Sequence, residues 1–166
     1  MGLDIIAYSN LHPVGTHTER WCNNEDHVVA FAYADFTQSF RGIPILSTST
    51  AGSGVDIIEG GCYERTEHTK DIGFQAGSYG GYGRWRDDLR CRFNPETAPD
   101  GPFYELIYFA DNEGSIGPDA ARDLLADFRE HAARYPLGLS EYSRERYSLW
   151  TQACELAADH GLIYFS

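Results

Sequence analysis

The chain has 166 residues, of which 42% are apolar and 14% are aromatic. These fractions exclude an intrinsically disordered chain, because a disordered sequence has too few apolar side chains to offset the entropy lost on folding. The formal net charge of −12 and the pI near 4.7 exclude duplex nucleic acid and anionic membranes as partners of the broad surface. A few arginines can still bind one small anion, because salt screens distant charges.

The length and composition predict a single domain over residues 1–166. No apolar stretch is long enough to cross a bilayer, and the opening MGLDIIAYSN lacks the basic segment of a secretory signal. We therefore expect a cytoplasmic protein without a membrane partner.

The four cysteines are widely spaced and include no C-x-x-C pair. We expect them to be free thiols, with at least one on the core face of a helix. The histidines and the cysteine between residues 12 and 27 recur every five residues, a spacing that does not suit a zinc site. We expect neither a metal nor a cofactor.

The first half of the chain contains short predicted strands separated by polar segments. The apolar run Leu3–Tyr8 is typical of a buried strand, and the β-branched and aromatic run Val28–Tyr33 predicts a second one. The polar stretch His12–Asp26 contains proline and glycine and predicts a loop between them. The signal from Phe36 to Gly61 is weak. Two further short strands are predicted at Cys62–Arg65 and Ile72–Gln75.

The second half of the chain begins with a helical pattern. Ser78 is placed to cap a helix whose apolar stripe has spacings of three and four residues. The stripe consists of Tyr82, Trp85, Leu89 and Phe93. The three prolines of Asn94–Pro102 end this helix. The segment Phe103–Phe109 is too short for periodicity to separate helix from strand, and Asp111–Gly117 is predicted to be a loop.

Two more helices and a final strand complete the prediction. Pro118 suits the first position of a helix that ends before Pro136 and has Ala121, Leu124, Leu125 and Phe128 inward. Ser140 caps the last helix, which Gly161 stops. Its inward residues are Tyr147, Trp150, Cys154 and Ala157. A terminal strand follows at Leu162–Phe165.

This order of elements predicts the fold class. Strands come early, helices come late, and a final strand returns to the sheet. We therefore predict an α+β fold, a single domain in which a small mixed or antiparallel sheet packs against three to four helices from the C-terminal half.

The segment Gly73–Arg92, GFQAGSYGGYGRWRDDLRCR, carries the clearest functional signal. Glycines at a helix start leave amide N–H groups accessible, and such a start favours an anion through those donors and the helix dipole. The tyrosines and Trp85 would stack on a base, and Arg84 and Arg86 would pair with phosphate oxygens. We predict ligand-binding residues here at Ser78, Tyr79, Tyr82, Arg84, Trp85 and Arg86.

A purely structural interpretation explains the same segment. The glycines then form a turn, Trp85 and Leu89 are core residues, and the arginines pair with Asp87 and Asp88 on a solvated face. The spacing matches neither G-x-x-x-x-G-K-[ST] nor G-x-G-x-x-G, so no established nucleotide-binding motif is present.

Three predicted ligand contacts lie outside this segment. Arg41 would bind phosphate, and Asp111 and Asn112 would contact a base edge or the ribose. With Glu113, the carboxylate of Asp111 also suits a cation site or an acid–base pair. We favour a plain turn over that catalytic role, because Asp and Asn are typical turn residues.

Several stretches resemble a group of small phage and prophage proteins. The resemblance rests on the opening MGLDIIAY, on GFQAGSYGGYGRWRDDL, on GPFYELIYFADNEGSIGP and on the closing helix with Tyr147 and Trp150. It implies a phage gene acting in the host cytoplasm, and phage proteins of this size often counter host defence. Some of them sequester the cyclic-nucleotide alarm signals of CBASS or Thoeris systems without cleaving them.

These observations support a hypothesis of function with two alternatives. We expect a protein that sequesters a nucleotide-derived small molecule, as a homo-oligomer, because large aromatic faces on a small domain often end at subunit interfaces. One alternative is a hydrolase that uses Asp111 and Glu113. The other is a protein-binding module whose acidic surface, with a net charge of −12, contacts a basic partner.

Overall fold

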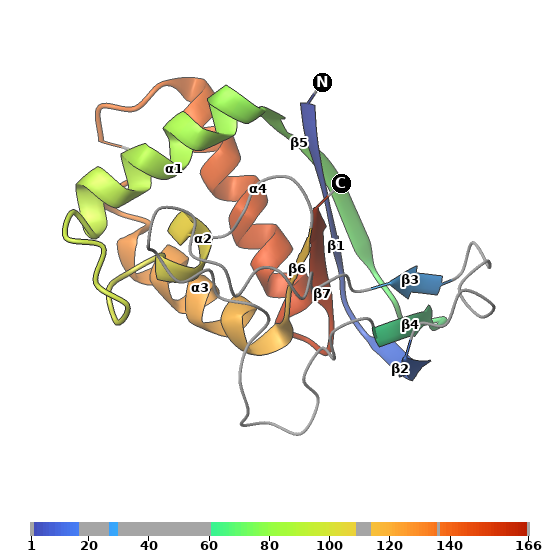
Figure 1. The fold of residues 1–166 in the computed structure, drawn as a ribbon. Helices are drawn as coiled ribbons and strands as arrows, with labels where there is room; N and C mark the ends of the chain where they lie inside the picture. Colours follow the sequence, from blue (N-terminus) through green and yellow to red (C-terminus); the bar gives the residue numbers. More distant parts are fainter. Residues whose placement is uncertain (1, 17–26, 30–60, 109–113, 136, 166) are drawn as a thin grey trace.

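The computed structural model describes residues 2–16, 27–29, 61–108, 114–135 and 137–165. Four strands form one sheet in the order β5-β1-β7-β6, with every neighbouring pair antiparallel (Figure 1). Their bounds are β1 Gly2–Tyr8, β5 Asp71–Ser78, β6 Gly114–Ile116 and β7 Leu162–Phe165. Three strands form a smaller antiparallel sheet in the order β2-β4-β3. These strands span Leu11–Thr16 (β2), Gly61–Arg65 (β4) and His27–Val29 (β3).

The helices of the described residues all lie on one face of the four-stranded sheet, and the smaller sheet lies on its other side (Figure 1). Their bounds are α1 Tyr79–Phe93, α2 Tyr104–Tyr108, α3 Pro118–His131 and α4 Glu141–Ala157. The predicted α+β fold class is therefore confirmed, and the sheet is of the antiparallel kind. No helix within the described ranges combines the length and the apolar character that a membrane span requires.

The alternation of side chains along β1 explains why both of its faces are covered. Leu3, Ile5 and Ala7 are completely buried in the main core under the helices. Ile6 and Tyr8 belong to a second, smaller cluster. Successive residues of a strand point to opposite faces, so a continuous apolar run such as this one serves two cores. The neighbouring strand β7 divides its residues between the same two clusters.

Aromatic rings join α1 to α4 in the main core. The ring of Trp150 on α4 stacks on Tyr82 at 5.8 Å between centroids and on Trp85 at 5.9 Å. All three side chains are almost completely buried. Three residues before Trp150 on α4, the Tyr147 hydroxyl donates to the carbonyl oxygen of Phe128 on α3 at 2.6 Å. These contacts place α4 between α1 and α3 and determine how the three helices pack.

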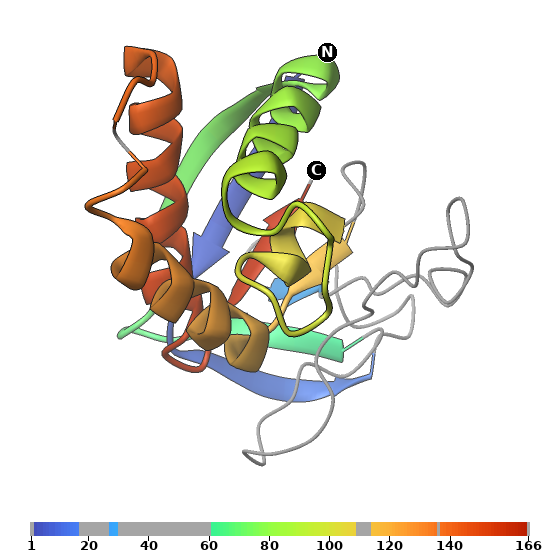
Figure 2. The ribbon, with the colours of Figure 1, turned by 90° about the vertical axis from the view of Figure 1, so that its left-hand side faces the viewer.

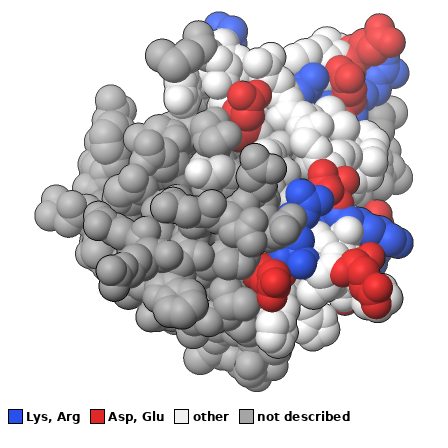
Figure 3. Space-filling view, turned by 90° about the vertical axis from the view of Figure 1, so that its right-hand side faces the viewer, with Lys and Arg blue, Asp and Glu red and all other residues white. Residues whose placement is uncertain are grey.

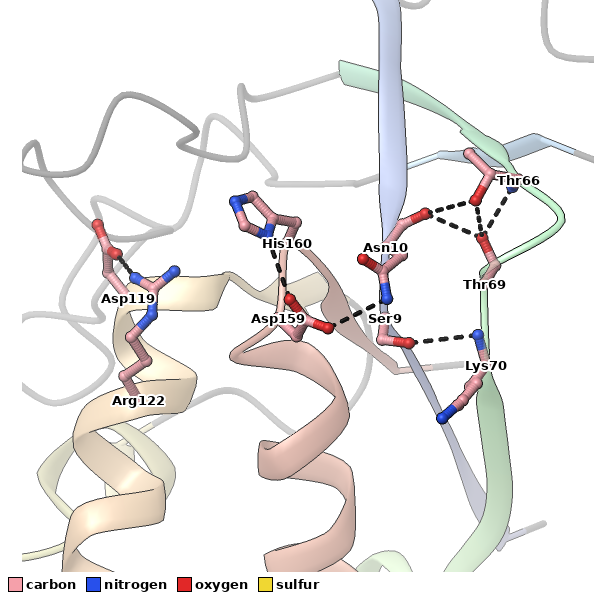
Figure 4. Close-up of polar contacts among 9 residues, drawn as sticks. All are labelled: Ser9, Asn10, Thr66, Thr69, Lys70, Asp119, Arg122, Asp159 and His160. Carbon is pink, nitrogen blue, oxygen red and sulfur yellow. Dashed lines mark hydrogen bonds and ion pairs between the residues drawn. The ribbon is translucent and has the colours of Figure 1, made fainter.

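A hydrogen-bonded corner connects the two sheets at the turn between β1 and β2 (Figure 4). The Asn10 side chain donates to the Asp159 carboxylate at 3.1 Å, and the hydroxyls of Thr66 and Thr69 donate to the Asn10 carbonyl. Asn10 and His160 both have left-handed backbone angles, which these two residue types adopt more easily than most. The corner therefore ties the start of β2 to the β4–β5 turn and to the end of α4.

Most predicted elements are confirmed. The structure contains the strand at residues 3–8, the strands at 62–65 and 72–75, the three long helices and the terminal strand, with ends at most four residues from those expected. Ser78 and Ser140 are the N-caps of α1 and α4, and Pro118 is the first residue of α3. The undecided segment 103–109 contains the short helix α2.

Two predicted loops are partly wrong. Residues 11–16 form β2, because their backbone pairs with β4 even though the sequence is polar. Residues 114–116 form β6, which pairs with β7 along the sheet edge. In both cases a partner strand far away in the chain supplies the hydrogen bonds that local propensity does not indicate. The rest of the first loop, residues 17–26, and most of the predicted strand Val28–Tyr33 lie outside the described residues.

Candidate functional site

A groove lies between α1 and the start of α4. It has a volume of about 540 Å³. Its lining comes from two stretches of the chain, Ser78, Gly81, Arg84, Trp85 and Asp88 from the first, and Leu139, Ser140, Tyr142 and Ser143 from the second. Figure 2 shows that both helices begin at the same end of the molecule, so their N-termini flank one space.

Each of the two helices begins with a capping serine that lines the groove. The Ser78 hydroxyl accepts the N–H of Gly81 at 3.1 Å, and the Ser140 hydroxyl accepts the N–H of Ser143 at 3.2 Å. The first turn of α1 contains no acidic residue, whereas the first turn of α4 contains Glu141. The partial positive charges of two helix starts therefore meet beside the groove.

Side chains of α4 hold the end of β5 in place next to this groove. The Tyr142 hydroxyl donates to the carbonyl oxygen of Ala76 at 3.1 Å, and the guanidinium of Arg146 donates to the carbonyl of Gln75. The next residue, Gly77, has a φ of +117°, and a Cβ there would lie 2.5 Å from the Tyr142 hydroxyl oxygen. Position 77 requires glycine, because other residues rarely adopt this φ angle and because a side chain there would collide with the Tyr142 hydroxyl.

Arg84 is the cation of the groove. Its side chain is exposed and forms no ion pair with any described residue. The neighbouring carboxylates are paired elsewhere, since Asp88 accepts from Arg92 at 3.0 Å and Asp87 from Arg90 at 3.3 Å. The expected pairing of arginines with Asp87 and Asp88 therefore exists, but it uses the two arginines at the end of α1 and leaves Arg84 available.

Three predicted ligand contacts need correction. The Tyr82 side chain is 0% exposed and stacked inside the core, so it cannot contact a ligand in this conformation. Trp85 lines the groove, but it is 4% exposed and stacks on Trp150 in the core. The Arg86 guanidinium lies over the Tyr82 ring at 4.8 Å and does not line the groove. Tyr82 and Trp85 belong to the apolar stripe of α1, which faces the core.

The other predicted residues are separated from the groove lining or lie outside the described residues. Tyr79 is exposed at the first position of α1 but does not line the groove. Arg41, Asp111, Asn112 and Glu113 lie outside the described residues. Among the predicted ligand contacts, the structure thus brings together Ser78, Arg84 and the mostly buried Trp85.

The second half of the groove lining was not predicted as a site. The sequence predicts Ser140 only as a helix cap, and it does not single out Tyr142 or Ser143. Nothing local in the sequence indicates that residues 139–143 lie beside residues 78–88. The only usable signal was the capping pattern itself, which occurs at both helix starts.

The described residues offer little nucleophilic chemistry near the groove. No histidine or cysteine is among the described residues that line it. Cys154, as predicted, is a free thiol on the core face of a helix, and burial raises the pKa of that thiol far above its ordinary value. A buried thiol with a raised pKa is unreactive. Within the described ranges no group of histidine, cysteine and carboxylate side chains is arranged to hold a metal ion.

The surface of the strand side carries charges of both signs. On the described part of this face, Lys and Arg side chains lie next to Asp and Glu side chains, without a large patch of one sign (Figure 3). The described aromatic residues are mostly buried, and the exposed large apolar side chains among them are Tyr79, Leu137 and Tyr142. The reason for expecting an oligomer, a large exposed aromatic face, is therefore absent from this part of the chain, and the homo-oligomer stays a prediction.

Comparisons with known proteins add no identification. No family model matches the chain, and no curated protein and no solved structure matches it either. The functional argument therefore depends on the groove itself.

Proposed function

We propose that this protein binds a nucleotide-derived, phosphate-bearing small molecule in the groove between α1 and α4 and holds it without cleaving it. The observation that carries this proposal is Arg84, an exposed guanidinium without an ion-pair partner among the described residues. It lines the same groove as the capping serines of two helix starts. A guanidinium with its forked donors suits a phosphate group.

The electrostatics of the groove favour an anion of limited size. Each helix start contributes about 0.3–1 kcal/mol to a nearby negative charge at low ionic strength. The groove volume of about 540 Å³ lies within the usual range of small-molecule sites. Its one described carboxylate, Asp88, is paired with Arg92, which reduces its repulsion of a phosphate.

The groove supports binding better than turnover. General acid–base catalysis needs a titratable group within hydrogen-bonding distance of the reacting atoms. Among the described lining residues, Asp88 is the only carboxylate, and its oxygen Oδ1 accepts from Arg92. The hydroxyl of Tyr142, the lining phenol, donates to the carbonyl oxygen of Ala76. A protein with this site would retain its ligand intact.

The biological role that we propose is sequestration of a signalling nucleotide. The resemblance to phage and prophage proteins supports this role, because a protein that holds a host cyclic nucleotide or a related immune signal would block the defence that depends on it. Binding alone would be enough for this function, so no catalytic residue is required.

A thermal-shift screen tests the proposal directly. The chain is heated with saturating cyclic di- and trinucleotides and ADP-ribose derivatives, one at a time, and we expect at least one of them to raise the unfolding temperature, since a ligand of the native state stabilises it. The bound compound is then released by denaturation and analysed by mass spectrometry. We expect the unchanged ligand, whereas conversion to a product would contradict the non-catalytic role. The absence of stabilisation by every compound would overturn the binding proposal.

Replacing Arg84 tests whether the groove is the binding site. We expect Arg84→Gln to weaken binding of the stabilising compound by about tenfold or more, because a charge-assisted hydrogen bond contributes about 1.5–3 kcal/mol. Arg134→Gln is the matched control, since it removes the same charge from an exposed residue that does not line the groove. Affinity is measured by isothermal titration calorimetry. Equal affinities for the two variants would place the site elsewhere.

A further inference from the structure

Tyr142 combines an exposed ring with a rigid attachment. Its side chain is 42% exposed, and its hydroxyl donates to the carbonyl oxygen of Ala76 on β5. The close approach to Gly77 leaves the hydroxyl no room on that side. Exposed side chains usually move between rotamers, and an exposed ring held at its far end by a neighbouring strand does not.

One face of the ring is already covered. The guanidinium of Arg146 lies over Tyr142 at 4.9 Å from the ring centroid, and Arg146 is itself held by the carbonyl of Gln75. Residues four apart lie on the same side of a helix, so the geometry of α4 itself brings Arg146 next to Tyr142. The exposed surface of the ring therefore belongs to its other face and edge.

Tyr142 is distinguished from the other exposed apolar residues by its position. The exposed large apolar side chains of the described residues are Tyr79, Leu137 and Tyr142, and of these only Tyr142 lines the groove. Arg84, the candidate phosphate contact, lines the same groove from the opposite helix. The ring of Tyr142 and the guanidinium of Arg84 thus line the same groove.

We propose that the ring of Tyr142 is a stacking platform for a planar heteroaromatic group of the ligand. The ligand class is then a nucleotide, whose base stacks on Tyr142 while its phosphate contacts Arg84, and not a sugar phosphate or a polyphosphate. This inference rests on the proposed function, because it assigns a second part of the ligand to the same groove. A tyrosine ring that is fixed before binding loses little conformational entropy when a base stacks on it.

The test compares three probes that share a phosphate, namely AMP, ribose 5-phosphate and inorganic phosphate. Calorimetry on the whole chain gives the affinity of each. We expect AMP to bind about tenfold or more tighter than ribose 5-phosphate, because stacking of a base on an aromatic side chain contributes a factor of this size. Equal affinities for AMP and ribose 5-phosphate would overturn the stacking platform and leave phosphate binding in the groove intact.

Three variants separate stacking from the structural role of the hydroxyl. Tyr142→Leu removes both the ring and the hydroxyl, and we expect it to bring the AMP preference, the ratio of the AMP and ribose 5-phosphate affinities, close to one. Tyr142→Phe, which also lacks the hydroxyl, is the reference for any change in ribose 5-phosphate affinity. Tyr142→Phe and Tyr142→Trp keep a ring, and we expect both to keep most of the preference. Circular dichroism and urea unfolding establish that each variant folds. A Tyr142→Leu variant that keeps the preference contradicts the inference, as does a Phe variant that loses it while remaining folded.

The outcome also distinguishes this inference from the proposed function. Failure of all three probes, together with failure of the cyclic-nucleotide screen, overturns both. Binding of ribose 5-phosphate and AMP with equal affinity, both sensitive to Arg84→Gln, overturns only the stacking platform.

Discussion

Two tyrosines in similar local sequences have opposite positions in the structure. Tyr82 on α1 and Tyr142 on α4 are each followed four residues later by an arginine whose guanidinium lies over the ring. Tyr82 is nevertheless completely buried, whereas Tyr142 is 42% exposed and lines the groove. The difference is the face of the helix, since Tyr82 belongs to the apolar stripe of α1 and Tyr142 lies in the first turn of α4, before its buried stripe begins at Tyr147.

At the residue scale, Gly161 illustrates a requirement that can be tested. A Cβ at this position would overlap the carbonyl oxygen of Tyr8, a backbone atom that cannot turn aside. We expect Gly161→Ala to lower the free energy of unfolding by about 2 kcal/mol or more, as overpacking of a tight site usually does. Urea denaturation measures the loss.

Gly83 provides the matched control for this substitution. A Cβ at Gly83 meets nothing within 4 Å, and the residue lies inside α1. We expect Gly83→Ala to stabilise the protein by up to about 1 kcal/mol, because alanine is the better helix former. If both substitutions have the same effect, the close contact between Gly161 and Tyr8 does not determine stability.

At the element scale, the starts of α1 and α4 create the groove. Both helices begin with a serine cap, and both starts lie at the same end of the molecule (Figure 2). A cap of this kind is usually explained by helix stability alone. Here the same hydroxyls also line the space beside Arg84, so capping and ligand binding use the same residues.

Substitutions of Ser78 separate these two roles. We expect Ser78→Ala to reduce the free energy of unfolding by about 1 kcal/mol, because the N–H of Gly81 loses its acceptor. Ser78→Asp keeps an acceptor at the cap, so we expect stability near that of the wild type. Its carboxylate lines the groove, however, and we expect it to weaken binding of a phosphate compound severalfold by repulsion. Urea unfolding and calorimetry measure the two effects, and unchanged binding by the Asp variant would argue against an anion at this helix start.

At the scale of the whole molecule, two half-buried carboxyl groups make stability depend on pH. Burial raises the pKa values of Glu105 and Asp127 above their ordinary values of 4.5 and 3.8, and the neighbouring carboxylate of Asp123 raises both further. The raised pKa of Asp127 persists although its oxygen accepts the backbone N–H of Phe103 at 2.7 Å. Both groups therefore bind a proton more tightly in the folded protein than in the unfolded one.

The sign of the pH effect follows from these shifts. The stability that Glu105 and Asp127 contribute is fully present below their unfolded pKa values and is lost as the pH rises through the raised folded values. We expect a Glu105→Gln, Asp127→Asn double variant to gain stability relative to the wild type as the pH increases from about 4 to 7. Urea unfolding at several pH values measures this difference. Asp100→Asn, at an exposed turn residue, is the control, and identical pH profiles for wild type and double variant would contradict the prediction.

Elements with their own periodicity were predictable from the sequence. The stripes of α1, α3 and α4 and the apolar runs of β1 and β7 carry enough local information, because an amphipathic pattern has only one favourable way to bury its apolar side. The strands β2 and β6 were not predicted, since their hydrogen bonds come from β4 and β7, which lie far away in the chain. Local propensity cannot report a partner at such a distance.

The candidate site was predictable only in part. Ser78 and Arg84, which the sequence predicts as ligand contacts, both line the groove, because a capped, glycine-rich helix start with a nearby arginine is a local feature. Their ligand contact stays a prediction. Sequence reasoning misplaced Tyr82 and Arg86, since aromatic and basic residues on one helix look alike until the buried face is known. The sequence does not predict that Tyr142 lines the groove, because more than fifty residues separate it from Arg84 in the chain.

The sequence by itself determined the fold class, the long helices and their serine caps, because each depends on interactions between residues close together in the chain. Only the tertiary structure decided which side chains of those helices face solvent, and that two helix starts lie side by side. The physical reason is that burial is a property of packing. Stacking of Trp150 on Tyr82 and Trp85 turns the aromatic face of α1 inward, and this leaves Arg84 and Tyr142 at the groove.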